Sequence, residues 1–209
     1  MDIDPARGAP VPCRWRVTAI IPVPTRALRR IEYECLVERG LFGADDRIEL
    51  IDGVLVLREP QSASHFTAIR RGQRALQRAF GAGWDVRPAG PVALDDHSEP
   101  EPDLAVVPGT VEDYAHAHPS RAVLVVEVSS TSLAFDRQYK SSLYARAGVT
   151  DYWIVNLVDR VLEVRRRPVT SDAAPYAWAY EELIVLGPAG VVTPVAAPFA
   201  SIPVADLLP

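Results

Sequence analysis

The sequence predicts a mixed α/β fold organised around one central β-sheet. Two apolar runs, 103–107 and 122–128, have the length and composition of buried strands. An Asp-Gly pair between two further apolar runs, at positions 52 and 53, is the strongest short-range signal for a hairpin. The expected order of elements is helix, hairpin, helix, strands, helix and strands. This order differs from a regular βαβ repeat, so we expect a mixed sheet flanked by helices.

The bulk composition fits one globular domain with a sizeable core. The chain has 209 residues, of which 48% are hydrophobic and 23% are charged, and this balance differs from that of a disordered chain. Its formal net charge of -5 and its pI near 5.4 argue against a broadly basic protein that coats nucleic acid. A local basic face stays compatible with these values.

Cysteine usage and hydropathy favour a soluble, cytoplasmic protein without a membrane partner. Cys13 and Cys35 form neither a metal-type cluster nor a disulfide framework, which suits a reducing compartment. The N-terminus lacks the apolar segment of a signal peptide. No apolar run approaches the roughly 20 residues that a membrane-spanning helix needs.

The N-terminal region divides into an arm and the start of the folded part. Residues 1–24 contain five prolines and little periodicity, so we expect a proline-rich arm. A single domain is expected over 25–209. Thr25 is a suitable N-cap for a helix that runs to Glu38, and Gly40 supplies its end.

Residues 47–57 predict an antiparallel hairpin, because both positions of its Asp-Gly turn tolerate positive φ. Side chains alternate along a strand, so Glu49 shares its side with the apolar Ile51, opposite Ile48 and Leu50. An acidic side chain on a partly buried face is a candidate metal ligand, either direct or through water.

The rest of the chain supplies the other expected elements. Ser64 is the expected cap of a second helix that ends at Phe80, before two glycines. Prolines break the segment 84–94 into two short strands or interrupt a single one. Further expected elements are a helix over 136–147, ended by Gly148, an antiparallel pair of strands over 152–156 and 161–164, and a tail of weak strands.

One carboxylate stands in the middle of an apolar strand. Burying Glu127 there is costly unless it is paired, hydrogen-bonded or bound to a metal. Asp103 stands at the head of another apolar strand, and Lys140 lies on the helix that follows. Hard oxygen ligands suit Mg²⁺ or Mn²⁺, and an amine can orient water or neutralise the phosphorane. The set predicts a divalent-metal site that hydrolyses phosphodiesters, with the Val128 carbonyl and Glu49 as further ligands.

Each of these residues also has a structural interpretation. Glu127 is compatible with a hydrogen-bonded structural carboxylate, and Asp103 with a residue that simply starts a strand. Lys140 is compatible with a surface ion pair to Asp136, four positions before it on the helix. The joint arrangement of acids and amine, rather than any one residue, favours the catalytic interpretation.

Motifs spread along the chain resemble those of a known family. They are Tyr33 to Gly53, His65, Pro102-Asp103, Val126-Glu127-Val128-Ser129-Ser130, Asp136 with Lys140, Tyr144 to Val149, and Asp151-Tyr152-Trp153. This ordered series is similar to the Uma-type family of restriction endonucleases, part of the PD-(D/E)XK nuclease superfamily. The resemblance covers nearly the whole chain, from residue 28 to residue 208.

The resemblance implies a restriction-endonuclease-like fold, in which a mixed central sheet flanked by helices carries the active site at one edge. It implies Asp103 and Glu127 as metal ligands and Glu49 as the acidic residue from the hairpin. The superfamily motif has a lysine two positions after the second acid, where this chain has Ser129. Lys140, from the following helix, is the matching residue.

We therefore expect a metal-dependent endonuclease that hydrolyses DNA by in-line attack of water, with Mg²⁺ or Mn²⁺ as cofactor. The alternative is a catalytically inactive nucleic-acid-binding or scaffold protein on the same fold. The intact set of acids and lysine favours the enzyme, whereas the acidic balance and the lack of a separate DNA-recognition domain favour the alternative. A homodimer is expected by analogy, because cutting both strands takes two active sites.

Two further features have open interpretations. His65 begins the second helix and could approach a metal or a phosphate, although a lone histidine is more often a capping or hydrogen-bonding residue. Arg70, Arg74 and Arg78 align along one helical face, either as phosphate contacts or as a solvated surface. The negative net charge favours the solvated surface slightly.

Overall fold

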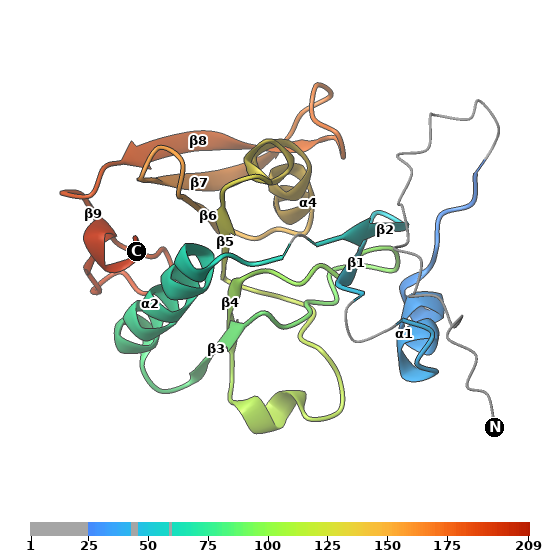
Figure 1. Ribbon diagram of the computed structural model, residues 1–209. Coiled ribbons are helices and arrows are strands. Elements are labelled where there is room, and N and C mark those ends of the chain that lie inside the picture. Colours follow the sequence, from blue (N-terminus) through green and yellow to red (C-terminus); the bar gives the residue numbers. More distant parts are fainter. Residues whose placement is uncertain (1–24, 43–45, 59) are drawn as a thin grey trace, which may run out of the picture.

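A six-stranded mixed sheet forms the centre of the molecule (Figure 1), which confirms the predicted α/β class. The computed structural model describes residues 25–42, 46–58 and 60–209, so the predicted arm and Cys13 lie outside the described residues. In spatial order, the strands are β3 (Trp84–Pro88), β4 (Leu104–Pro108), β5 (Leu124–Ser129), β6 (Asp151–Asn156), β7 (Val161–Thr170) and β8 (Trp178–Leu186). Strands β5 and β6 run parallel, and the other neighbouring pairs run antiparallel.

Alternation along β5 decides which side chains reach the two faces of the sheet. Val126 and Val128 belong to the apolar core that contains residues of α2 (Ala63–Phe80). Val125 belongs to the opposite core, with Tyr144 of α4 (Ser141–Arg146). Because side chains alternate, Glu127 points to the α4 face. The C-terminal segment completes the α2 face with β9 (Val191–Val192), β10 (Ile202–Pro203) and the 3₁₀ turn Val204–Asp206.

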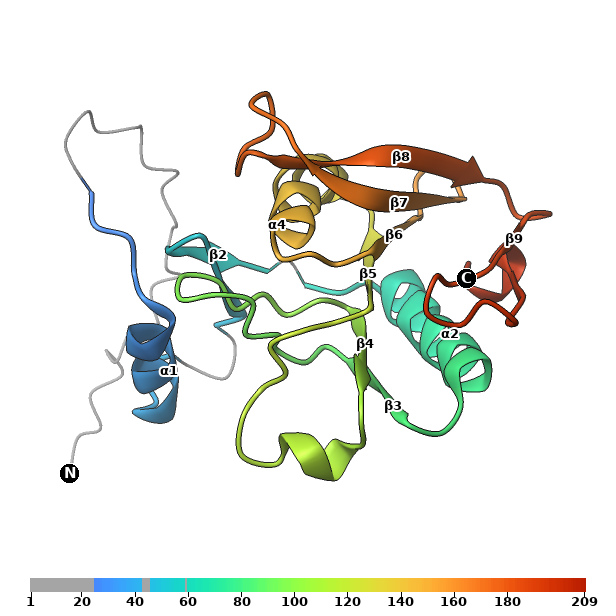
Figure 2. The ribbon, with the colours of Figure 1, turned by 180° about the vertical axis from the view of Figure 1, so that it is seen from behind.

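The predicted hairpin is present as β1 (Ile48–Ile51) and β2 (Val54–Leu57). Its turn residues Asp52 and Gly53 have φ of 49° and 80°, as the Asp-Gly signal requires. Helix α1 (Arg30–Glu38) packs Tyr33 against the buried face of β1. Seen from both sides, α1 and the hairpin lie at the end of the molecule opposite β9 (Figures 1 and 2).

The start of α1 corrects the sequence-based prediction, because the helix does not begin after Thr25. The Leu28 N–H donates to the Gly53 carbonyl at 3.0 Å, so this part of the chain pairs with the hairpin turn instead of coiling. At the first helical turn, the Glu32 carboxylate accepts from the Arg29 N–H at 2.9 Å. The predicted end is confirmed, since Gly40 has φ of 65°.

Helix α2 begins two residues earlier than predicted and ends where it was expected. Ser62, rather than Ser64, is the N-cap, and its Oγ accepts from the His65 N–H at 3.2 Å. Gly81 follows the helix with φ of 67°. The segment 84–94 contains the single strand β3, which stops at a proline.

The third predicted helix begins at Leu133 and contains a change of helical type. It consists of α3 (Leu133–Phe135), a π-helical turn (Asp136–Lys140) and α4. Strands β6 and β7 form the predicted antiparallel pair, but β7 continues six residues beyond position 164 to pair with β8. A short 3₁₀ turn, Val111–Tyr114, lies between β4 and β5. Among the described residues, no helix is long and apolar enough to cross a bilayer.

Candidate active site

Three of the four predicted catalytic residues meet at one point in the folded chain. Glu49 lies on β1, Glu127 on β5, and Lys140 at the end of the π-helical turn. The Lys140 Nζ is 3.1 Å from Glu49 Oε1 and 3.0 Å from Glu127 Oε1. All three side chains are buried. Burial of three charges is tolerable because they compensate one another at hydrogen-bond distance.

The π-helical turn places Lys140 in the interior. The N–H of Ser141 reaches back to the Asp136 carbonyl, five residues earlier, which is the π-type spacing. The widened turn buries both Asp136 and Lys140. Two hydroxyls hold the start of this turn, because Ser129 and Ser132 donate to Asp136 Oδ2 at 2.8 and 2.7 Å. The surface ion pair between Asp136 and Lys140 is therefore the wrong interpretation, since Lys140 pairs with acids on the strands.

Glu127 forms a buried pair with Lys140 and accepts a second hydrogen bond from a tyrosine. Tyr144 donates its hydroxyl to Glu127 Oε1 at 2.8 Å, beside the contact with Lys140. Burial raises the pKa of Glu127 to about 8, and nearby carboxylates add to this, while Lys140 opposes it. Burial alone would lower the pKa of Lys140, but Glu127 and Glu49 outweigh it and raise that pKa above its usual value. Lys140 is therefore a protonated ammonium.

Asp103 lies one residue before β4 and is held by contacts from three directions. Its Oδ2 accepts from the Val128 N–H at 2.8 Å and lies 3.1 Å from His65 Nε2. Its Oδ1 lies 3.4 Å from Gln61 Nε2 and 3.6 Å from Arg58 Nη2. Burial works to raise the pKa of Asp103, but the imidazole of His65 and the Val128 N–H outweigh it and hold the pKa below its usual value. Asp103 is accordingly an ionised, oriented carboxylate.

A second cation, the half-buried Arg58, also contacts acids of this region. Arg58 follows β2, and its Nη1 is 2.6 Å from Glu101 Oε2. The backbone N–H of Glu101 in turn donates to Glu49 Oε2 at 3.0 Å. Arg58 thus contacts Glu101 and Asp103, whereas Lys140 contacts Glu49 and Glu127.

The four predicted catalytic residues and Arg58 line one cavity of about 880 Å³. Its charged walls consist of four acids and three cations, namely Glu49, Asp103, Glu127, Asp136, Arg47, Arg58 and Lys140. Carboxylate oxygens are the donors that hard divalent cations prefer, so the donor chemistry fits Mg²⁺ or Mn²⁺. Within the described part of the chain, however, no three Asp, Glu, His or Cys side chains already form a metal cluster. The ammonium of Lys140 stands between Glu49 and Glu127 instead.

Comparison with known proteins gives the family of the chain. The model of the Uma2 family, described as "Putative restriction endonuclease", matches residues 31–196. The chain belongs to the Uma2 family. That matched range contains every residue of the cavity described above, and it confirms the resemblance inferred from the motifs.

A solved structure supports the same fold for this Uma2 protein. It is described as "a putative nuclease belonging to DUF820 from Anabaena variabilis ATCC 29413", with a TM-score of 0.61 and 15% identity. The likeness covers 82% of this chain and 96% of the other, and it shows the restriction-endonuclease-like fold. The comparison with curated proteins gave no match.

The amino-acid composition also singles out Lys140 as a candidate functional residue, a signal that the motifs alone did not reveal. The Uma2 chain has 22 lysines and arginines, and Lys140 is the only lysine among them. Arginine therefore serves at every other basic position, and the single amine is buried between two acids. An ammonium is compact and shifts its pKa with environment, whereas a guanidinium does neither. Arg58 and Gln61 gave no comparable signal, because only the fold brings them to Asp103.

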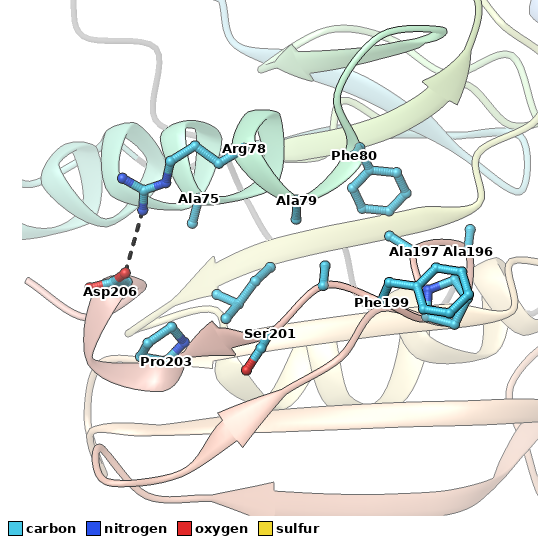
Figure 3. Close-up of a pocket in the computed structure, with 13 residues that line it drawn as sticks. Ala75, Arg78, Ala79, Phe80, Ala196, Ala197, Phe199, Ser201, Pro203 and Asp206 are labelled. Carbon is cyan, nitrogen blue, oxygen red and sulfur yellow. Dashed lines mark hydrogen bonds and ion pairs between the residues drawn. The ribbon is translucent and has the colours of Figure 1, made fainter.

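The arginine stripe on α2 lies away from these acids, with Arg70, Arg74 and Arg78 exposed. Near it, a second cavity of about 570 Å³ separates α2 from the C-terminal segment (Figure 3). Most of its lining residues are apolar, and an ion pair of 3.4 Å joins Arg78 to Asp206 at its side. Without clustered acids, this cavity lacks the groups for hydrolysis, so the first cavity is the candidate active site.

Proposed function

We propose that this Uma2 protein is a metal-dependent endonuclease that hydrolyses phosphodiester bonds in DNA. The main support for this proposal is the only lysine of the chain, Lys140. It is buried at hydrogen-bond distance from Glu49 and Glu127, in the cavity that Asp103 also lines. Acids from β1, β5 and the start of β4 meet there, although they are far apart in the sequence. The family description supports action on nucleic acid.

In this proposal, Asp103 and Glu127 hold Mg²⁺ or Mn²⁺, and Glu49 and the Val128 carbonyl are further ligands. When bound, such an ion supplies Lewis acidity and lowers the pKa of coordinated water. Asp103 suits a ligand because it is ionised and oriented by the Val128 N–H. The role of each ligand is a proposal that rests on donor chemistry and on the shared cavity.

Lys140 then acts as a fixed positive charge. Since its carboxylate neighbours raise its pKa, it holds its proton and donates hydrogen bonds, rather than serving as a base. A buried ammonium stabilises negative charge that develops on the phosphate more strongly than an exposed one would, because the surroundings exclude water. Arg58 lines the same cavity and offers a second set of N–H donors.

We further propose that the substrate is DNA, that the protein assembles as a homodimer and that it is located in the cytoplasm. The description of the family as restriction endonucleases supports DNA. Cleavage of both strands by one type of site supports a twofold dimer. The two-cysteine composition supports a reducing compartment.

A nuclease assay tests this function. Supercoiled DNA, linear DNA, single-stranded DNA and RNA are incubated separately with the protein and with Mg²⁺, Mn²⁺ or a chelator. We expect metal-dependent cleavage of DNA that Asp103→Asn abolishes, with Asp85→Asn as the control outside the cavity. Cleavage that persists in chelator or in Asp103→Asn contradicts the proposal. Binding of DNA without cleavage under every condition supports the inactive binding protein instead.

A further inference from the structure

His65 has an unusual position beside the candidate metal ligand Asp103. It lies in the first turn of α2, where its backbone N–H is fixed by the Ser62 cap at 3.2 Å. Its side chain is 16% exposed, and its Nε2 lies 3.1 Å from Asp103 Oδ2. The buried Nε2 nevertheless makes no hydrogen bond. The contact therefore has the distance of a hydrogen bond or ion pair but lacks hydrogen-bond alignment.

The separation of the two atoms suits neighbouring ligands of one ion. Ligand bonds of about 2.1 Å at right angles, as in octahedral coordination, place adjacent donor atoms about 3 Å apart. Asp103 Oδ2 is independently oriented by the Val128 N–H at 2.8 Å, while Gln61 and Arg58 contact the other oxygen. The oxygen is thus held in place by the Val128 N–H, and the first turn of α2 brings the imidazole of His65 beside it.

We propose that His65 is a nitrogen ligand of the metal in this site, and that the site consequently selects Mn²⁺ over Mg²⁺. This inference rests on the proposed function, because it needs a metal at Asp103. Imidazole is a softer donor than carboxylate, and Mg²⁺ prefers oxygen ligands in near-ideal octahedra. A nitrogen donor therefore favours Mn²⁺ and later divalent transition metals, whose affinity for nitrogen sites rises along the series.

A simple ion pair between His65 and Asp103 is the competing explanation. An ion pair directs the Nε2–H at the carboxylate, whereas here the contact lacks hydrogen-bond alignment. An ion pair would also leave metal preference unchanged when His65 is replaced. The two explanations therefore differ in whether a histidine nitrogen couples to bound Mn²⁺. They also differ in how replacement of His65 changes the affinity for Mn²⁺ relative to that for Mg²⁺.

Pulsed electron paramagnetic resonance on the Mn²⁺-loaded full chain tests the proposal without measuring activity. We expect a ¹⁴N coupling to bound Mn²⁺ in the wild type, and its replacement by a ¹⁵N coupling when histidine is ¹⁵N-labelled, which needs no mutation. The His65→Gln variant should lose this coupling. In calorimetry, the same variant should bind Mn²⁺ about tenfold more weakly than the wild type, whereas its Mg²⁺ affinity should fall by less than about twofold. His116→Gln, at an exposed loop position, is the matched control and should behave as the wild type.

Three results would overturn the proposal, and the first two separate it from the proposed function. If Mn²⁺ binds and Asp103→Asn abolishes binding, but no histidine nitrogen couples to the ion, the metal site stands and His65 is only a neighbour. If Mn²⁺ does not bind at any concentration tested, both the nitrogen ligand and the metal-dependent function fail. An equal fall in Mg²⁺ and Mn²⁺ affinity in His65→Gln would contradict the selectivity.

Discussion

At the residue scale, the site depends on one ammonium that balances two buried carboxylates. Lys140 lies within 3.1 Å of both Glu49 and Glu127, and removal of one partner from a buried ionic group leaves the others uncompensated. We expect Lys140→Ala to lower the free energy of unfolding of the metal-free protein by about 3 kcal/mol. Urea denaturation followed by circular dichroism measures this loss.

The matched control for this variant is an ion pair on the surface. Arg167 pairs with Glu181 at 3.2 Å, and both side chains are largely exposed. Solvent screens such a pair, so Arg167→Ala should change the free energy of unfolding by less than about 1 kcal/mol. Equal losses of unfolding free energy in the two variants would show that the buried ion pairs of Lys140 stabilise the fold no more than a surface ion pair does.

Glu99 gives a pH dependence to stability that is separate from the acids of the cavity walls. Burial raises its pKa to about 7 from an ordinary 4.5, and the charge of Glu34 and a hydrogen bond with it add to the rise. The folded state therefore holds this proton more tightly than the unfolded state. The stabilisation is complete below pH 4.5 and is lost as the pH rises through about 7.

Glu99→Gln should remove this dependence, because the amide does not titrate. Between pH 5 and pH 8, we expect the wild type to lose about 1–3 kcal/mol more of its free energy of unfolding than Glu99→Gln does. Urea denaturation at three or four pH values provides the comparison. Parallel pH profiles for the two proteins would show that Glu99 titrates normally in the folded state.

At the element scale, the hairpin that carries Glu49 depends on a glycine in its turn. Gly53 has φ of 80°, and an added Cβ would lie 2.5 Å from the Ala27 Cβ. Gly40 also has positive φ, of 65°, but an added Cβ there meets nothing within 4 Å. Gly53→Ala should therefore cost about 3 kcal/mol in thermal or urea unfolding, against about 1 kcal/mol for Gly40→Ala. A similar loss of stability in both variants would show that positive φ alone, and not the contact with Ala27, determines the effect of the substitution.

The packing of residues 27 and 28 against Gly53 also explains which elements could be predicted from the sequence. The hairpin was predictable because the Asp-Gly turn is a local signal. The start of α1 was not, because the Leu28 N–H pairs with the Gly53 carbonyl, 25 residues away in the chain. The π-helical turn at Asp136–Lys140 was also missed, since a helical pattern over 136–147 does not reveal a single widened turn.

At the scale of the whole molecule, sequence reasoning found the acids and the amine but not their surroundings. Glu127 was conspicuous because it interrupts an apolar strand, and its place beside Asp103 followed from neighbouring strands. The groups around Asp103, namely Arg58, Gln61 and His65, come from the end of the hairpin and the start of α2. Their positions are set by how α2 crosses the sheet, which no local pattern encodes.

A bound divalent cation should stabilise the whole fold. Ligand binding to the native state alone adds about 2.7 kcal/mol at a concentration of 100 times Kd, and this corresponds to a rise of roughly 5–10 °C in Tm for a domain of this size. We expect such a rise with Mn²⁺ or Mg²⁺, and a smaller rise in Glu127→Ala, measured by differential scanning fluorimetry. Identical melting curves with saturating metal and with chelator would count against a metal site.

Lys140, between Glu49 and Glu127, is proposed to serve the reaction, and single-turnover cleavage of DNA at saturating Mn²⁺ measures this role. The assay compares the wild type with Lys140→Ala and Lys140→Arg at a temperature where circular dichroism shows all three folded. We expect both variants to lose at least about 100-fold in rate, because alanine removes the charge and the bulkier guanidinium does not fit between the two carboxylates. Wild-type rates in Lys140→Ala would contradict the account and remove Lys140 from the active site.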